Sequence, residues 1–219
     1  MPSESALRDG SPAGFELIET LRWEPAEGFL RFDRHMARLE TSAHALGFAF
    51  DRPSVEEALV RAVGGDAPLR VRLALDRAGR PNVTIQSFLP LPAGTVWTLA
   101  IAKTPLDSSN PLLRHKTTLR SAYDAARAEF SREAADEVVL LNEAGNVCEG
   151  TITTIFADMG DGALKTPPLG DGLLAGVLRG ELLDTGKAVE APLTVADLRN
   201  ARALYVGNSL RGLISARLA

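Results

Sequence analysis

Lys116 and Glu149 are the two residues whose types and spacing best fit a covalent cofactor site. Lys116 lies in the run RHKTT at 114–118, and Glu149 follows 33 residues later in a stretch rich in β-forming residues. Lysine is scarce, with four among 24 basic residues. A lysine amine can form a Schiff base with a cofactor aldehyde, and a carboxylate can keep a pyridine nitrogen protonated so that the ring accepts electrons. The pair therefore predicts an enzyme that uses pyridoxal phosphate.

Each of the two residues also has a plainer interpretation. On an exposed surface Lys116 would have no role, whereas burial would favour the neutral amine that attacks an aldehyde and later moves the substrate's α-proton. Glu149 could face solvent from a strand. Inside an apolar, threonine-rich strand it would instead need a partner, such as a protonated ring nitrogen or an arginine. Gly150 beside it would let a backbone or a flat ring approach closely.

Three places in the sequence could bind a phosphate group. One is an arginine on a predicted helix, because a guanidinium binds phosphate with paired hydrogen bonds, although such arginines often lie on a solvated face. The second is a glycine-led turn after two prolines, and the third is a turn after a strand; each offers backbone N–H groups, or is simply a tight turn. The candidate phosphate ligands are Arg38, Gly176, Val177, Leu178, Asn208 and Ser209.

Four other side chains are candidates for the cofactor or the substrate. Tyr123, on the apolar face of the segment after Lys116, belongs either to the core or beside the cofactor. Arg70 and Arg72 alternate with apolar residues, so they project to one face of a strand, where they could receive a substrate carboxylate or meet solvent. Arg120 is the third arginine that could meet the substrate. No metal site is expected, because the histidines are few and dispersed and the single cysteine has no spaced partner.

The pattern of apolar residues predicts an α+β chain that positions these side chains. Asp33 is placed to cap the first helix and Gly47 to end it, Ser54 and Glu57 form a capping box for the second, and Thr194 caps the last. The expected helices cover 33–47, 54–64, 118–133, 172–184 and 195–201. The expected strands cover 15–23, 69–76, 82–89, 96–103, 137–142, 147–158, 203–206 and 213–216.

Composition and turn signals set the expected organisation. Residues 1–14 read as a loose tail, and the turn-rich connector 104–111 separates an N-terminal α/β lobe, 15–106, from a C-terminal lobe, 112–219, that carries Lys116. Net charge is −4, and no basic block suggests nucleic acid as a partner. The single cysteine fits a reducing cytoplasm, and neither a signal peptide nor a membrane span is expected.

Taken in order, these segments resemble the class IV aminotransferases, the fold-type IV pyridoxal-phosphate enzymes, which include branched-chain and D-amino-acid aminotransferases and aminodeoxychorismate lyases. The resemblance covers about residues 15–213. Its segments are HMARL at 35–39, HKTT at 115–118 through Tyr123, DEVVLLN at 136–142 with CEGT at 148–151, TPPL at 166–169 with GVLR at 176–179, and NSLRG at 208–212. The resemblance implies two α/β lobes with pyridoxal 5′-phosphate between them, an amino-acid-like substrate and a homodimer. It assigns Lys116 to the aldehyde, Glu149 to the ring nitrogen and Arg38 to the phosphate.

The sequence departs from the family pattern in three places. The glycine-rich stretch before the first Glu-Thr pair is missing, Thr151 and Thr154 replace a serine and an asparagine, and Leu178 stands where a threonine often helps to bind phosphate. Two reactions remain open: transamination against a 2-oxo acid, and elimination of pyruvate from aminodeoxychorismate, towards which NSLRG at 208–212 inclines the prediction. A non-cofactor site for an anionic metabolite and a catalytically silent pyridoxal-phosphate-binding protein are further alternatives.

Overall fold

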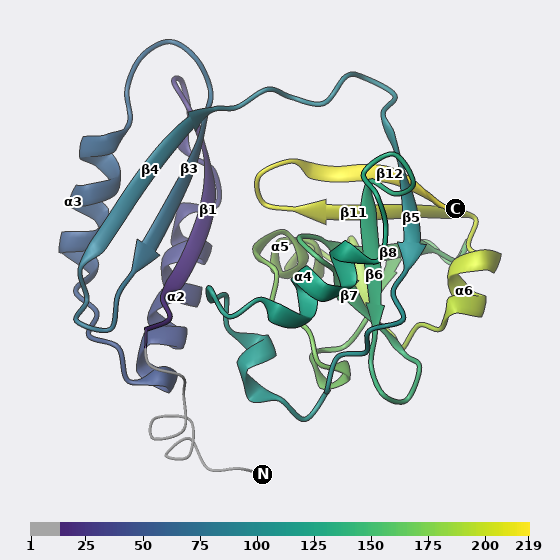
Figure 1. Ribbon diagram of the computed structural model, residues 1–219. Helices are drawn as coiled ribbons and strands as arrows, with labels where there is room; N and C mark the ends of the chain where they lie inside the picture. The colour runs from purple at the N-terminus through teal and green to yellow at the C-terminus, as the bar shows by residue number, and fades with distance from the viewer. Residues whose placement is uncertain (1–13) are drawn as a thin grey trace. The chain divides into compact units, whose positions relative to one another are not determined.

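Residues 14–219 are described by a computed structural model, in which the chain divides into two compact units (Figure 1). The first unit holds the residues up to Leu89 together with His115–Leu119, and the second holds Pro90–Arg114 and Arg120–Ala219. The tail expected over 1–14 lies outside the described residues, apart from Gly14. Within the described part of the chain, no helix is both long and apolar enough to cross a membrane.

The first unit is an antiparallel sheet with two helices. Its strand order is β2-β1-β3-β4, and β3 and β4 pair in antiparallel fashion, at the positions of the two predicted strands 69–76 and 82–89. Leu17, Leu21 and Leu73 of the strands are fully buried, as are Met36 and Leu39 of the first helix. The elements are β1 (Leu17–Glu24), β2 (Gly28–Phe29), α2 (Phe32–Leu46), α3 (Arg52–Ala62), β3 (Leu69–Leu75) and β4 (Pro81–Ser87).

Helix ends in this unit only partly follow the predicted caps. Gly47 ends α2 with φ 70°, as expected of a glycine C-cap. The predicted N-cap at Asp33 is wrong, because Arg31 occupies that position in a left-handed conformation and Asp33 lies in the first turn. The capping box at Ser54 is also wrong: Asp51 caps α3 by accepting a hydrogen bond from the Ser54 N–H, so the helix begins two residues earlier.

The segment His115–Leu119 belongs to the first unit because it pairs with the start of β1. The Ile18 N–H donates to the Lys116 carbonyl at 2.9 Å, and the Thr118 N–H donates to the Glu16 carbonyl at 3.0 Å. The Thr118 hydroxyl in turn accepts from the Glu16 N–H. This division differs from the predicted one, which placed Lys116 with the C-terminal half and the boundary near 104–111.

The second unit is built on an eight-stranded mixed sheet of order β10-β9-β8-β11-β12-β5-β6-β7. Because β7, at one end of that order, leads through three residues into the interior strand β8, the sheet must curl back on itself. The strands are β5 (Val96–Ile101), β6 (Glu137–Leu141), β7 (Val147–Gly150), β8 (Thr154–Asp158), β9 (Leu164–Thr166), β10 (Ala188–Glu190), β11 (Ala203–Asn208) and β12 (Gly212–Leu218). β5 joins this unit by pairing in parallel with β6 and β12.

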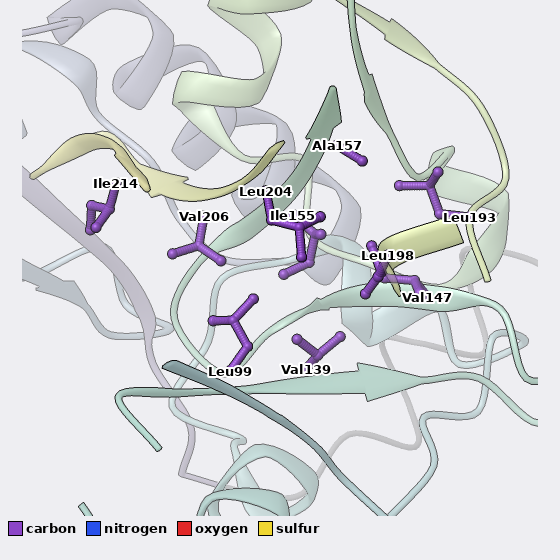
Figure 2. Close-up of a cluster of buried hydrophobic side chains, with 10 residues drawn as sticks. All are labelled: Leu99, Val139, Val147, Ile155, Ala157, Leu193, Leu198, Leu204, Val206 and Ile214. Atoms are coloured by element: carbon purple, nitrogen blue, oxygen red, sulfur yellow. The ribbon is translucent and has the colours of Figure 1, made fainter. Parts of the chain in front are cut away.

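Apolar side chains from six strands of the curled sheet meet in one core cluster (Figure 2). Leu198 of helix α6 (Val195–Asn200) packs into the same cluster, and Thr194 caps that helix with the predicted capping geometry, completed by Asp197. Two smaller clusters contain residues of α4 (Ser121–Ala128) and α5 (Val177–Asp184). Both helices are shorter than predicted: α4 begins after its N-cap Arg120 and already ends at Ala128, and α5 begins after its N-cap Gly176.

The continuous strand predicted over 147–158 is wrong, because Thr151–Thr153 form a turn that separates β7 from β8. A second irregularity precedes it. Leu140 pairs with Glu149 and Leu141 with Val147, so Cys148 is an extra residue on β7, as in a β-bulge. Val147 therefore lies in the core cluster of Figure 2, whereas Glu149 lies opposite Leu140, which belongs to the cluster that packs against Tyr123.

Candidate active site

Arg38 lies in a buried ion-pair network of the first unit. Its Nε and Nη2 donate to the two carboxylate oxygens of Glu19 at 2.8 and 2.5 Å, and His35 Nδ1 lies 2.7 Å from Glu19 Oε2. Burial by itself would raise the pKa of Glu19, but the charges and hydrogen bonds of Arg38 and His35 lower it to about 2. The guanidinium is thus held by β1 on the inner face of α2, not on a solvated helix surface.

Lys116 is positioned by its backbone, through the pairing with β1 described above. Its neighbours are fixed as well: His115 Nδ1 lies 2.9 Å from the Ser42 hydroxyl of α2, and the Thr117 hydroxyl accepts from the Leu119 N–H at 3.2 Å. Thr117 is buried and Lys116 is partly buried. The amine therefore extends from a segment that hydrogen bonds immobilise on both sides.

Glu149 presents a buried carboxylate in the second unit, with 6% of the residue exposed. Its Oε1 accepts hydrogen bonds from the Tyr123 hydroxyl at 2.7 Å and from the Leu174 N–H at 3.1 Å. Burial, and then the charge of Glu149, raise the pKa of the Tyr123 phenol, so that the hydroxyl stays protonated and donates. The predicted solvent-facing alternative for Glu149 does not apply, because the β-bulge turns it towards α4.

Arg120 lies beside Tyr123 and the end of β7. Its guanidinium carbon lies 4.6 Å from the centre of the Tyr123 ring, within the range of a cation–π contact. Its Nη2 donates a short hydrogen bond to the Thr151 carbonyl. The structure therefore brings Arg120, Tyr123 and Glu149 together around the end of β7, while the last two make contact directly.

The predicted glycine-led phosphate turn is the start of α5. Gly176 is its N-cap, with no side-chain cap hydrogen bond, so the first N–H groups depend on partners outside the helix. Leu178 is buried with Phe156 rather than directed at a ligand. A Cβ on Gly207 would lie 2.8 Å from Leu178 Cδ2, so the absence of a side chain there lets α5 approach β11 closely.

Asn208 and Ser209 lie at the β11–β12 turn. Asn208 uses its side chain within the unit: Nδ2 donates to the Ile152 carbonyl at 3.2 Å, and Oδ1 accepts from the Arg211 N–H at 3.0 Å. Ser209 is buried, with 7% exposed. The close approach of Leu178 to Gly207 brings this turn near the N-terminus of α5, as the two phosphate predictions require.

Arg70 and Arg72 share one face of the first sheet with a third arginine. Arg22 on β1 is the direct cross-strand partner of Arg70, and Thr20 is the partner of Arg72. Arg70 is exposed, and the other two are partly exposed. Because side chains alternate along a strand, this row lies opposite the face on which Glu19 meets α2. Arg120, the third predicted substrate arginine, belongs to the second unit.

The sequence analysis missed two buried carboxylates, Glu19 and Glu137, each 1% exposed. Glu19 binds Arg38, and Glu137 binds the turn after β7. Both carry a signal in the sequence. Glu19 falls in phase with the apolar residues Leu17 and Leu21, and Glu137 opens an otherwise apolar strand. A carboxylate on a buried face must find several hydrogen-bond donors, so each of these positions indicates a polar network.

The residues present fit pyridoxal phosphate. Glu149 is a buried carboxylate that accepts hydrogen bonds from the Tyr123 hydroxyl and the Leu174 N–H, and a carboxylate is the acceptor that a protonated ring nitrogen needs. The uncapped start of α5 offers N–H groups to a phosphate, and the close approach at Gly207 is one that a Cβ would obstruct. The first unit separately holds a partly buried lysine, Lys116, and a paired arginine, Arg38.

Comparison with known proteins places the chain in a family. The family model described as amino-transferase class IV matches residues 16–219. A crystal structure from Mesorhizobium loti, provisionally named an amino-acid aminotransferase, is 56% identical, with 94% of this chain and 100% of that chain covered and a TM-score of 0.92. A Schizosaccharomyces pombe protein, provisionally named an aminodeoxychorismate lyase, is 33% identical over 202 residues, which cover 89% of this chain and 86% of that protein.

A more distant structure shows the same fold. The 4-amino-4-deoxychorismate lyase from Pseudomonas aeruginosa is 24% identical, with 96% of this chain and 89% of that chain covered and a TM-score of 0.76. The predicted fold class is therefore confirmed. Together with the match over residues 16–219, these findings show that the chain belongs to the class IV aminotransferase family and is a pyridoxal-phosphate-dependent enzyme.

Proposed function

We propose that this enzyme has aminodeoxychorismate lyase activity, releasing pyruvate from 4-amino-4-deoxychorismate and leaving 4-aminobenzoate. The row formed by Arg22, Arg70 and Arg72 carries this proposal. The substrate has two carboxylates, and guanidinium groups bind carboxylates with paired hydrogen bonds. The name of the S. pombe relative supports the same activity.

The cofactor residues are assigned on the contacts described above. Lys116 would hold the aldehyde, Glu149 would accept a hydrogen bond from the protonated ring nitrogen, and Tyr123 would fix the Glu149 carboxylate through the 2.7 Å hydrogen bond. The phosphate would be bound by Arg38, by the N–H groups of Gly176, Val177 and Leu178, and by the turn containing Asn208 and Ser209.

The chemistry divides between cofactor and protein. When bound, pyridoxal phosphate supplies an aldehyde for amines and an electron-accepting ring that stabilises negative charge next to the substrate nitrogen. Lys116 removes a proton from the substrate carbon that bears the nitrogen, and acts as the general base and then the general acid. Cleavage of the ring carbon–oxygen bond releases the three-carbon group as enolpyruvate, which takes up a proton to give pyruvate. The remaining ring becomes aromatic, which drives the elimination.

The decisive experiment supplies the purified holoenzyme with 4-amino-4-deoxychorismate and, separately, with a panel of amino acids and 2-oxoglutarate. We expect equimolar 4-aminobenzoate and pyruvate in the first assay. Lys116→Ala should show neither product and should lose the visible absorbance band of the lysine-bound cofactor. Amino transfer without pyruvate release would contradict the proposal. An unchanged absorbance band in Lys116→Ala would contradict the assignment of the lysine.

The arginine row predicts a selective effect on substrate binding. Arg72→Ala should raise KM for the dicarboxylate by about 10-fold or more, because a charged hydrogen bond contributes about 1.5–3 kcal/mol. Arg61→Ala is a matched control, since Arg61 is an exposed arginine on α3 that pairs with Glu57. Equal KM values for the two variants would contradict the assignment of the arginine row to the substrate site.

A second candidate activity is transamination of an amino acid against a 2-oxo acid. The observation in its favour is the 56% identity to the M. loti protein, whose provisional name is amino-acid aminotransferase. The same pair of assays tests it, because only transamination consumes 2-oxoglutarate. The family resemblance further suggests a homodimer, which sedimentation velocity of the holoenzyme would test, and the single buried cysteine is consistent with a cytoplasmic enzyme.

A further inference from the structure

The turn Thr151–Thr153 follows Glu149 and Gly150, and the buried carboxylate of Glu137 accepts most of its hydrogen bonds, beside two backbone hydrogen bonds, from the Thr151 N–H to the Val138 carbonyl and from the Gly150 N–H to the Thr153 carbonyl. Glu137 Oε1 accepts from the Thr151 N–H at 3.1 Å, from the Thr151 hydroxyl at 2.6 Å and from its neighbour, the Val138 N–H, at 2.9 Å. Its Oε2 accepts from the Ile152 N–H at 3.1 Å and from the Thr153 hydroxyl at 2.9 Å. Both oxygens are thus saturated by neutral donors, four of them from the turn.

The opposite edge of the same turn contacts two candidate site residues. The Thr151 carbonyl accepts from Arg120, and the Ile152 carbonyl accepts from Asn208 at 3.2 Å. The peptide unit between Thr151 and Ile152 is therefore fixed on both sides, since its carbonyl accepts from Arg120 and its N–H donates to Glu137. A shift of the turn would therefore move Arg120 and Asn208 together, as well as Glu149 one residue before Gly150.

Gly150 is part of the same arrangement. A Cβ at this position would lie 2.4 Å from the Thr153 hydroxyl and 2.9 Å from the Glu137 carboxyl carbon. A side chain at position 150 would thus collide with both the Thr153 hydroxyl and the Glu137 carboxyl group that it contacts. Thr151 and Thr153 retain the hydroxyl groups that the carboxylate needs, so the replacement of a serine by Thr151 costs no hydrogen bond.

We propose that Glu137 is a positioning residue of the active site: it sets the turn Thr151–Thr153 and, through it, the orientations of Glu149, Arg120 and Asn208. It acts on the cofactor only through these residues. The proposal rests on the assigned role of Glu149 at the ring nitrogen. It predicts that weakening the hydrogen bonds of Glu137 changes cofactor affinity and the pH titration of the bound cofactor, and not merely the free energy of unfolding.

The test compares two hydrogen-bonded Thr–Glu pairs of the second unit. Thr153→Val removes one donor to Glu137 with little change of shape. Thr104→Val is its control, because the Thr104 hydroxyl donates at 2.6 Å to Glu129, which also accepts the N–H groups of Lys103 and Thr104. Glu137→Gln against Glu129→Gln repeats the comparison at the carboxylates. If Glu137→Gln does not fold, the comparison of Thr153→Val with Thr104→Val tests the proposal by itself.

Three quantities are measured for each variant: the dissociation constant of pyridoxal phosphate from equilibrium dialysis, the pH titration of the visible band of the holoenzyme, and the urea midpoint of the apoenzyme. We expect Thr153→Val to weaken cofactor binding by about 10-fold, the lower end of the range known for outer-shell partners in metal sites, and to shift the titration. Thr104→Val should lower the urea midpoint while keeping the dissociation constant and titration within about twofold.

Glu149→Gln is the reference variant for the shared assumption. If it weakens cofactor binding and Thr153→Val and Glu137→Gln do not, the positioning role of Glu137 is overturned and its hydrogen bonds serve stability alone. If Glu149→Gln itself leaves dissociation constant and titration unchanged, the role of Glu149 is wrong and the proposal fails with it. Aspartate at position 137 keeps the charge, so partial rescue by Glu137→Asp over Glu137→Gln would support positioning.

Discussion

At the scale of single residues, the candidate site depends on how carboxylates are paired. Glu19 is paired with the Arg38 guanidinium and lies in hydrogen-bond contact with His35, whereas the five donors to Glu137 are neutral N–H and hydroxyl groups. A carboxylate that holds a guanidinium benefits from charge pairing, whereas one that holds a turn needs several donors from the backbone and its hydroxyl groups.

The lowered pKa of Glu19 predicts a specific dependence of stability on pH. Because the folded pKa of about 2 lies below the ordinary value of 4.5, the ionised carboxylate stabilises the fold above about pH 4.5, and this contribution is lost as the pH falls towards 2. Glu19→Gln should therefore lower the free energy of unfolding at neutral pH by an amount on the order of 3 kcal/mol. Urea titrations of both proteins between neutral pH and about pH 3 check this. A difference that stays constant with pH would contradict it.

Tyr123→Phe removes one of the two hydrogen bonds described for Glu149 and keeps the ring. Because the raised pKa of the phenol keeps it a donor at any working pH, we expect the loss to be independent of pH. The expected cost is about 1 kcal/mol in cofactor affinity. Equilibrium dialysis of pyridoxal phosphate measures it. Affinity equal to that of the wild type would mean that the Tyr123 hydroxyl does not orient the carboxylate.

At the scale of elements, close approaches between backbones decide where the phosphate candidates lie. The contact of α5 with β11 requires that Gly207 have no side chain, because a Cβ would also lie 2.9 Å from the Gly212 carbonyl oxygen. Gly207→Ala should destabilise the fold by about 1–3 kcal/mol through overpacking. It should also weaken cofactor binding, since the start of α5 would be displaced.

Gly64→Ala is the control for this prediction, because a Cβ at Gly64 would meet no atom within 4 Å and its φ is not positive. Thermal unfolding and cofactor dialysis of both variants give the comparison. If Gly207→Ala matches Gly64→Ala in both measurements, the approach of α5 to β11 does not position the phosphate site.

At the scale of the whole molecule, cofactor binding should stabilise the folded chain by mass action. Pyridoxal phosphate at about 100 times its dissociation constant should add about 2.7 kcal/mol to the free energy of unfolding. Pyridoxal, which lacks the phosphate, should add much less, because Arg38 and the start of α5 would have no ligand. Calorimetric scans with both compounds check this, and equal effects would argue against a phosphate site. Lys116→Ala should retain part of the stabilisation by pyridoxal phosphate, since the phosphate contacts remain.

The sequence by itself determined the order of most elements, the family and the cofactor. These predictions rest on apolar periodicity and on the short segments around Lys116, Glu149 and Arg38, which involve only residues close to one another in the sequence. Several helix ends differ from the predicted ones because backbone N–H groups hydrogen-bond to side chains other than the predicted caps, as the Ser54 N–H does to Asp51.

Only the tertiary structure revealed the break between β7 and β8, the β-bulge at Cys148 and the pairing of Lys116 with β1. Each of these depends on hydrogen bonds between separate segments, which alternation along a single strand cannot report. For the break between β7 and β8, the hydrogen bonds are chiefly those from the turn to Glu137. Lys116 and Glu149 were thus found from residue type, whereas the direction in which Glu149 points was decided by one extra residue in a strand pair.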